Sequence, residues 1–251
     1  MYINLDNPIV ERKTKTVYKD NDKTIKLFVE NYSKANILNE ALNQARVEEG
    51  TELAVPKLIE VSKIDNRWAL VSEHIEGKPL DKLMEEHPEK EDEYLNKFID
   101  VQLEVLSNKV PLLNRMKEKY RRKINETEIN ENTKYDLLQR LEGMKSELNL
   151  CHGDFNPSNV IIKENGTAYV IDWAHVTVGN SAADAARTYL IFSLEDKETL
   201  AEKYLNLFSE KSGIEKSNIQ RWIPIVAAAQ LADGNCDKEL LNKWVDVIEY
   251  Q

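Results

Sequence analysis

Cysteine, glycine and long apolar runs are all scarce in this chain. Its 251 residues include two cysteines, Cys151 and Cys236, and eight glycines. Two thiols far apart in the sequence make no disulfide framework and suit a reducing compartment. The most apolar run, residues 223–232, has about ten residues, too few to cross a bilayer, and the first residues lack the apolar core of a signal peptide. We therefore expect a cytoplasmic protein without a membrane partner.

Positive charge is also in deficit. The chain carries 34 lysines and arginines against 44 acidic residues, a net charge of −10, which argues against nucleic acid as a partner. The four histidines are scattered and show no metal-ligand spacing. A chain of 251 residues is long enough for one large domain or two small ones.

The most informative stretch runs from Cys151 to Trp173 and reads CHGDFNPSNVIIKENGTAYVIDW. Within it, Asn165-Gly166 is a strong hairpin signal, because a type I′ turn needs two residues that tolerate positive φ. The flanking segments are rich in β-branched and aromatic residues, as strands are. With these two loop residues, Asn159 directly faces Asp172, at a Cβ separation of about 4.5–5.5 Å.

A carboxylate beside a carboxamide suits Mg²⁺, which takes oxygen ligands from one or two protein groups together with substrate phosphates. Asp154 stands on the loop that enters the hairpin. The order Asp154, Asn159, Asp172 fits phosphoryl transfer, in which the first aspartate accepts the hydroxyl proton and the other two residues hold the metal. The alternative is a tight loop with an Asx turn at Asp154 and a solvated hairpin end, but the three residues at this spacing favour the catalytic interpretation.

Residues 152–159 (HGDFNPSN), followed by residues 171–173 (IDW), closely resemble the aminoglycoside phosphotransferase-like kinases, a group that includes choline and fructosamine kinases. The resemblance implies an α+β, bilobal protein-kinase-like fold. Residues 1–76 would form a small nucleotide-binding lobe of antiparallel strands with one helix, and residues 77–251 a larger, mostly helical lobe with the catalytic loop and the acceptor site. His152 would support the catalytic loop.

The first part of the chain predicts strands at residues 14–19 and 24–29, and a helix capped by Ser33. The apolar stripe of this helix is predicted to be Ile37, Leu38, Ala41, Leu42 and Ala45. Alternation alone would put Lys26 on the polar face of its strand. The resemblance instead implies that Lys26 pairs with Glu40 and contacts the nucleotide phosphates.

The glycine-rich loop of protein kinases is absent. The first turn offers only RKTKT, residues 12–16, so how the phosphates are held stays open. Lys13 or Lys15 could contact phosphate, although exposed loop lysines are the commoner case. Two more strands are predicted at residues 57–63 and 67–74, with the lobe boundary at the turn that follows. By resemblance, the backbone at Glu73 and Ile75 would bind the adenine.

The rest of the chain predicts helices. One begins near Glu89, another is capped by Thr133, and three more cover residues 194–211, 218–232 with a kink at Pro224, and 237–250. Asp184 opens a further helix. It resembles the family aspartate that braces the catalytic loop, although a carboxylate at a helix N-terminus is also favoured by the dipole alone.

The sequence therefore predicts a Mg²⁺-dependent enzyme that transfers the γ-phosphate of ATP or GTP to a hydroxyl of a small molecule. A catalytically silent nucleotide-binding regulator is the alternative, and a protein kinase is disfavoured by the short segment after Asp172. The acidic net charge mildly favours a cationic acceptor. Acceptor identity, the choice of nucleotide and the oligomeric state stay open.

Overall fold

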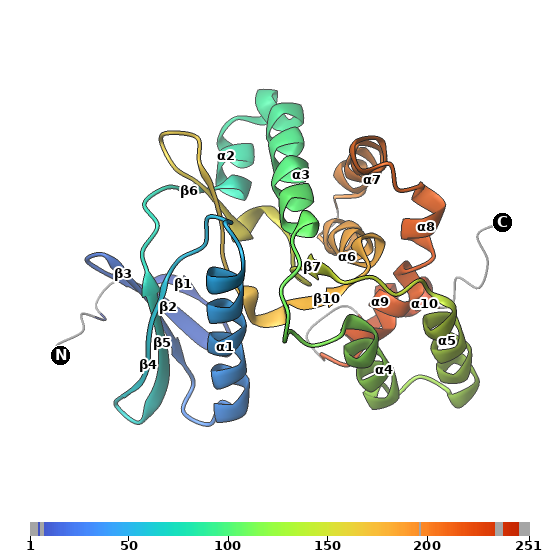
Figure 1. The fold of residues 1–251 in the computed structure, drawn as a ribbon, viewed down its shortest axis with the longest axis horizontal. Coiled ribbons are helices and arrows are strands. Elements are labelled where there is room, and N and C mark those ends of the chain that lie inside the picture. Colours follow the sequence, from blue (N-terminus) through green and yellow to red (C-terminus); the bar gives the residue numbers. More distant parts are fainter. Residues whose placement is uncertain (1–4, 6–7, 196, 234–237, 246–251) are drawn as a thin grey trace. The chain divides into compact units, whose positions relative to one another are not determined.

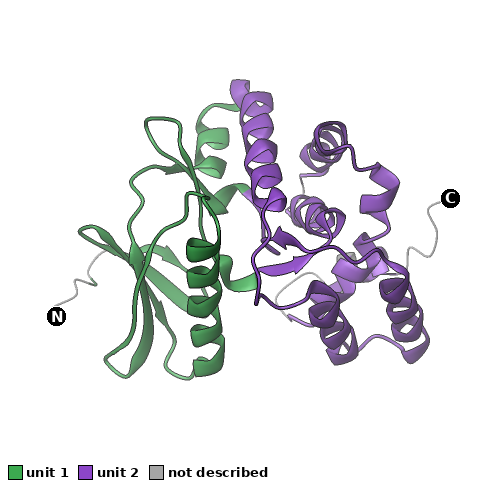
Figure 2. Cartoon of the chain, viewed as in Figure 1, with its two compact units in different colours: residues 1–88, 157–175 green, residues 89–156, 176–251 purple. Residues whose placement is uncertain are grey.

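The computed structural model describes residues 5, 8–195, 197–233 and 238–245. The chain forms two compact units (Figure 2). Unit 1 comprises residues 1–88 and 157–175, and unit 2 comprises residues 89–156 and 176–251. The predicted boundary between residues 76 and 77 therefore falls inside unit 1, and the hairpin assigned to the second lobe also belongs to unit 1.

Unit 1 contains an antiparallel sheet in the order β1-β2-β3-β5-β4 (Figure 1). The strands are β1 (Pro8–Glu11), β2 (Lys15–Asp20), β3 (Lys23–Phe28), β4 (Leu58–Ile64) and β5 (Arg67–Glu73). The hairpin turns lie where predicted, because Asn21, Asp65 and Asn66 adopt positive φ, which asparagine and aspartate tolerate better than most residues. Alternation buries Ile25, Leu27, Ala69 and Val71 together on one face.

The other face of the sheet packs against helix α1 (Lys34–Gly50) through Phe28, Ile37, Ala41 and Leu70. The cap at Ser33 is confirmed, since its hydroxyl accepts a hydrogen bond from the backbone N–H of Asn36 at 3.3 Å. The predicted apolar stripe is partly wrong.

On α1, Leu38 and Leu42 are exposed, while Glu40 and Gln44 are buried. These two polar side chains can turn inward because each has a partner: Glu40 pairs with Lys26, and Gln44 donates to the carbonyl of Pro56 at 2.9 Å. Burial without such partners would be costly.

Three short strands form a second sheet in unit 1, in the order β6-β8-β9. They are β6 (Lys78–Pro79), β8 (Val160–Ile162) and β9 (Ala168–Val170), and helix α2 (Leu80–Glu86) follows β6 directly. Gly77 permits the close approach of β6 to β8, because a Cβ there would lie 2.6 Å from the carbonyl oxygen of Ile162. This pairing keeps residues 77–88 and the hairpin in one unit.

The predicted register of the β8–β9 hairpin is wrong by one residue. Lys163 pairs with Thr167 and accepts a hydrogen bond from Gly166 N–H at 2.8 Å, so residues 164–166 form the loop. Only Gly166 has positive φ, at 82°, as in the three-residue loops that end in a left-handed residue. Asn159 consequently faces Ile171, whose N–H donates to its carbonyl at 3.0 Å, and Asp172 lies one residue further on.

Unit 2 is mostly helical. Its helices are α3 (Glu91–Ser107), α4 (Met116–Glu126), α5 (Glu131–Gly143), α6 (Ser181–Leu194), α7 (Glu198–Ser212), α8 (Lys216–Gln220), α9 (Ile223–Leu231) and α10 (Lys238–Val245). Strands β7 (Asn149–Cys151) and β10 (Thr177–Gly179) pair antiparallel and lie beside α6 in Figure 1.

Two helix predictions in unit 2 need correction. Asn130, and not Thr133, caps α5, and its side chain accepts from the Thr133 N–H at 2.9 Å. Pro224 does not kink a single helix: it stands in the first turn of α9, where a missing N–H costs little, so the predicted helix is divided into α8 and α9. Of the predicted helix 237–250, residues 238–245 are helical, and the remainder, like Cys236, lies outside the described residues.

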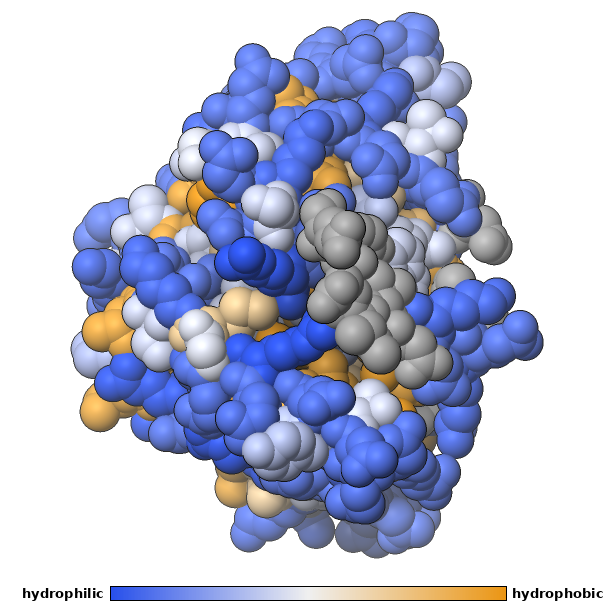
Figure 3. Space-filling model, turned by 90° about the vertical axis from the view of Figure 1, so that its right-hand side faces the viewer, coloured by the Kyte–Doolittle hydropathy of each residue, from blue (hydrophilic) through white to orange (hydrophobic). Residues whose placement is uncertain are grey.

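Hydrophilic residues dominate the face shown in Figure 3, where hydrophobic residues form separate patches. Among the described residues, no helix is both long and apolar enough to cross a membrane.

Candidate functional site

Unit 1 brings together the two residues predicted to hold the nucleotide phosphates. The Nζ of Lys26 on β3 lies 2.7 Å from Oε1 of Glu40 on α1 and 3.0 Å from Oδ1 of Asp172. The sheet packs against α1 on the face that carries Lys26, which explains why a strand residue meets a helix residue here. The predicted Lys26–Glu40 pair is present, and Asp172 extends it to a three-residue cluster.

The charges of this cluster stabilise one another. Burial would by itself lower the pKa of Lys26, but the carboxylates of Asp172 and Glu40 offset that effect and raise the pKa above its ordinary value. Burial would likewise raise the pKa of Asp172, but the ammonium groups of Lys26 and Lys15 lower it. Near neutral pH an ionised Lys26 therefore lies against an ionised Asp172.

Lys15 is the second cation on Asp172. Its Nζ lies 2.9 Å from Oδ2 of Asp172, and its side chain is 19% exposed. Lys15 stands at the start of β2. It adjoins the turn for which the sequence does not predict how the nucleotide phosphates are held.

Asn159 and Asp172 are neighbours at the open end of the hairpin, although they do not face each other directly. Asn159 is buried at 8% exposure, and Asp172 has a φ of 64°, a left-handed conformation that aspartate tolerates better than most residues but that is uncommon outside glycine. Such backbone outliers occur often at functional sites. The described residues hold no group of three acidic, histidine or cysteine ligands for a metal. A Mg²⁺ ion that also binds nucleotide phosphates needs fewer protein ligands, and one carboxylate with one carboxamide fits it.

Glu73 ends β5 and Ile75 follows in the connector, where it is buried. The N–H of Glu73 donates to the carbonyl of Lys57 at 2.9 Å. A nucleotide contact through the backbone of Glu73 would therefore have to use its carbonyl. Adenine binding at these two residues stays a prediction.

Unit 2 carries the loop with the predicted catalytic base. Asp154 keeps a side-chain exposure of 32%, and Asn156 donates its amide to the Asp154 carbonyl at 3.0 Å. His152 is fully buried; its Nδ1 accepts from the Asp154 N–H at 3.3 Å, and its ring meets Phe155 edge-on at 5.7 Å. These contacts hold the loop while leaving the Asp154 carboxylate partly accessible.

Helix α6 supports the same loop through two residues one turn apart. The carboxylate of Asp184 accepts from the N–H of Gly153 at 2.8 Å and from Gln102 at 3.2 Å. Burial raises the pKa of Asp184, although these hydrogen bonds act in the opposite direction. Asp184 thus contacts the loop that carries Asp154 and does more than complement the helix dipole; its role in supporting a catalytic loop stays a prediction.

The second α6 residue, Arg187, was missed by the sequence analysis. Its Nη2 donates to Oδ1 of Asp154 at 3.1 Å, and its Nη1 is buried without a hydrogen-bond partner among the described residues. Lys119 on α4 lies close enough to Asp154 and Arg187 to interact with both electrostatically. The only sequence signal for Arg187 was its position three residues after Asp184.

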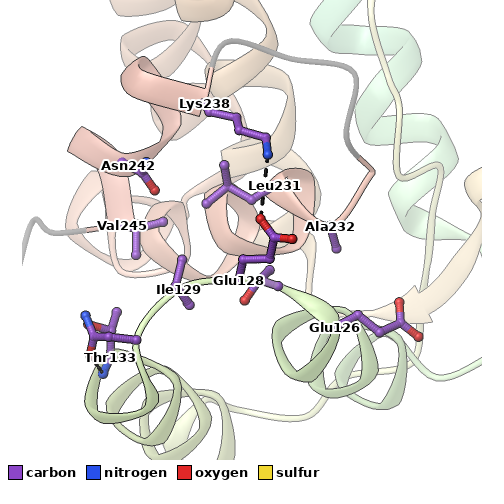
Figure 4. A pocket seen from close by; sticks show the side chains of 11 residues that line it. Glu126, Glu128, Ile129, Thr133, Leu231, Ala232, Lys238, Asn242 and Val245 are labelled. Atoms are coloured by element: carbon purple, nitrogen blue, oxygen red, sulfur yellow. Dashed lines mark hydrogen bonds and ion pairs between the residues drawn. The ribbon is translucent and has the colours of Figure 1, made fainter.

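A cavity of about 500 Å³ lies in unit 2 between the α4–α5 connection and the ends of α9 and α10 (Figure 4). Glu128 and Lys238 face each other across it, 3.9 Å apart. Its lining contains none of the predicted site residues.

An antiparallel sheet with one packed helix, a lysine–glutamate–aspartate cluster and a mostly helical second unit together define a kinase-like α+β fold. The family model described as the phosphotransferase enzyme family matches residues 26–216 of the chain. The chain belongs to that family.

Several solved structures that share the fold are aminoglycoside phosphotransferases. A thermostable mutant of APH(4)-Ia, in a ternary complex with ADP and hygromycin B, matches with a TM-score of 0.70 at 13% identity, over 96% of this chain and 92% of that one. APH(3'')-Id from Streptomyces rimosus, in complex with ADP and streptomycin, matches with a TM-score of 0.60 at 15% identity, over 85% of this chain and 90% of that one.

The type VIII aminoglycoside-3'-phosphotransferase has a TM-score of 0.63 at 14% identity, with coverage of 91% of this chain and 93% of that one. Identities at this level show the shared fold alone. No curated protein sequence matches this chain significantly.

Proposed function

We propose that the protein is a Mg²⁺-dependent small-molecule kinase that transfers the γ-phosphate of ATP or GTP to a hydroxyl group. The observation that carries the proposal is the position of Lys26, within 3.0 Å of both Glu40 and Asp172. A lysine held by a helix glutamate beside an aspartate that can bind metal is what phosphoryl transfer requires on the nucleotide side.

In this proposal, unit 1 binds the nucleotide. Lys26, oriented by Glu40, contacts the phosphates, Asn159 and Asp172 hold the metal, and the backbone of Glu73 and Ile75 binds the base. Mg²⁺, when bound with the nucleotide, would neutralise charge on the phosphate oxygens.

Unit 2 activates the acceptor. Asp154 accepts the proton from the acceptor hydroxyl as the oxygen attacks the γ-phosphorus and the bond to the β-phosphate oxygen breaks. Arg187 orients the Asp154 carboxylate, and Asp184 and His152 hold the loop. The catalytic residue and the nucleotide residues belong to different units, so both units are needed for turnover.

We propose a class of acceptor by analogy with the related structures. Hygromycin B and streptomycin accompany the related structures, and the net charge of −10 is compatible with such cationic acceptors. Amino alcohols, sugars and nucleosides belong in the same screen. We place the activity in the cytoplasm, where nucleoside triphosphate is available and thiols stay reduced.

The test measures nucleotide binding and nucleotide consumption separately. Thermal unfolding with millimolar Mg-ATP or Mg-GTP should show a higher Tm, since a ligand at one hundred times its Kd adds about 2.7 kcal/mol, and EDTA should remove most of the increase. Consumption of ATP and GTP is then followed against a panel of hydroxyl compounds, with Asp154→Asn as the inactive control. Absence of any nucleotide-dependent shift would contradict the proposal. A shift without turnover on any acceptor would favour the silent regulator.

A further inference from the structure

The turn between β1 and β2 has no glycine with which to surround a phosphate. The first glycine of the chain is Gly50, and the turn reads RKT over residues 12–14. The N–H of Arg12 donates to the carbonyl of Lys15 at 2.9 Å, and the N–H of Val29 donates to the carbonyl of Thr14 at 3.0 Å. Within the turn the N–H of Arg12 is thus already engaged, and without glycine the backbone cannot fold closely around a phosphate, so we look to side chains for the phosphate contact.

Lys15 is placed to supply that side chain. Val17 pairs directly with Lys26 across the β2–β3 ladder, so Val17 and Lys26 point to the same face of the sheet. Lys15 lies two residues before Val17 and therefore points to that face as well. Two lysines from adjacent strands thus converge on the predicted metal ligand.

Each of the two lysines contacts a different oxygen of the Asp172 carboxylate. Lys26 binds Oδ1 at 3.0 Å and Lys15 binds Oδ2 at 2.9 Å. A divalent cation bound by Asp172 would compete with these ammonium groups for the same oxygens and would repel them.

Only one of the two lysines has a second carboxylate in this cluster. Glu40 holds Lys26 at 2.7 Å, so Lys26 stays anchored if Asp172 turns to a metal. Lys15 contacts Asp172 from the end of a four-carbon side chain, which can swing its ammonium group to a new anion. The phosphate oxygens that arrive with the metal can then replace the Asp172 carboxylate as the partner of Lys15.

We propose that Lys15 leaves Asp172 when metal and nucleotide bind, and that it then binds the polyphosphate in place of a glycine-rich loop. The inference rests on the proposed function and extends it with a phosphate-binding residue. It assigns Lys15 two linked roles: it opposes metal binding before the nucleotide arrives, and it favours the nucleoside triphosphate once the metal is present.

The first test compares nucleotide affinity among Lys15→Met, Lys15→Arg and Lys13→Met. Lys13 is the matched control, because it lies in the same turn, carries the same charge and is exposed. A charge-assisted hydrogen bond is worth about 10- to 100-fold in affinity. Lys15→Met should lose Mg-ATP affinity by about this factor, with a smaller loss for adenosine, whereas Lys15→Arg should keep most of it and Lys13→Met should resemble the wild type.

The second test measures Mn²⁺ affinity without nucleotide by electron paramagnetic resonance, a readout independent of turnover. Lys15→Met should bind Mn²⁺ more tightly than the wild type, because one counter-ion of Asp172 is gone, and Lys13→Met should not. Opposite effects on metal and on Mg-ATP would support the inference, since simple loss of folding weakens both.

Two results would overturn the inference. If Lys15→Met and Lys13→Met bind Mg-ATP equally well and the wild type also binds it, Lys15 does not bind the polyphosphate. The proposed function would be unaffected by that result. A wild type that binds neither ATP nor GTP would overturn both together.

Discussion

The guanidinium of Arg187 lies 3.1 Å from the carboxylate of Asp154, joining helix α6 to the loop that carries the predicted base. The Arg187 side chain is 15% exposed and that of Asp154 is 32% exposed. The ion pair is thus shielded on the arginine side and open on the aspartate side, which suits a carboxylate that must be oriented and still reach a substrate.

We expect Arg187→Met to lower turnover by roughly 10- to 100-fold, the usual worth of a hydrogen bond to a charged group. Nucleotide affinity should stay near that of the wild type, because Arg187 acts through the Asp154 carboxylate, which in the proposed mechanism takes the acceptor proton and does not hold the nucleotide. Arg187→Lys should restore part of the turnover. Arg122→Met, at an exposed position on α4, is the control. Equal turnover in the two methionine variants would contradict a positioning role for Arg187.

The two aspartates should separate by role. Asp154→Asn should keep Mg-nucleotide affinity close to wild type while turnover falls by about 10²–10⁴, the usual contribution of a general base. Asp172→Asn should lose metal-dependent affinity as well, because a carboxylate charge toward the dication is removed. Nucleotide affinity is measured with and without Mg²⁺, alongside turnover. The assignment is reversed if Asp154→Asn abolishes metal-dependent binding and Asp172→Asn retains it.

Substitutions of Lys26 and of Glu40 should affect nucleotide use to different extents. Lys26→Ala should lower kcat/KM for the nucleotide by about 10- to 100-fold, because it removes the cation that meets the phosphates. Glu40→Gln should have a smaller effect, since the amide keeps the shape and one hydrogen bond to Lys26. Steady-state kinetics at varied nucleotide concentration measure both variants. Wild-type kcat/KM in Lys26→Ala would show that this lysine has no part in nucleotide use.

Stability should depend on pH through Lys119. Burial, followed by the neighbouring ammonium of Lys123, lowers the pKa of Lys119 to about 7. An unfolded lysine titrates near 10.4, so between about pH 7 and 10 the unfolded state binds more protons than the folded state. The free energy of unfolding should therefore rise with pH in this range, by at most about 1.4 kcal/mol per pH unit for one proton.

Lys119→Met should flatten that rise and unfold at a higher temperature near pH 7. Lys109→Met, at an exposed position, should keep the wild-type slope. Urea unfolding from pH 7 to 9 measures all three proteins, and identical slopes would show that Lys119 keeps an ordinary pKa.

Local sequence determined the elements whose physical cause is local. The Ser33 cap and the turns around Asn21 and Asn66 follow from side-chain hydrogen bonding and from tolerance of positive φ. The spacing of Asp154, Asn159 and Asp172 indicated a phosphotransferase before any contact was known, because the chemistry fixes the residue types and their order along the chain.

Tertiary structure decided what depends on partners distant in sequence. Hydrophobicity favoured Leu38 and Leu42 as the inner face of α1, but Glu40 and Gln44 turn inward because Lys26 and the Pro56 carbonyl receive them. The hairpin register was predicted wrongly for a local reason. One left-handed glycine suffices for a three-residue loop, and Asn-Gly is compatible with a loop of two residues or of three.

The sequence also could not predict that Lys15 contacts Asp172 or that Arg187 contacts Asp154. These pairs are separated by 157 and 33 residues, and an isolated lysine or arginine carries no local signature of its partner. The residue order determined which chemistry the chain can perform. Sheet pairing and helix packing decided which charges meet, because those contacts bring together segments that the sequence keeps apart.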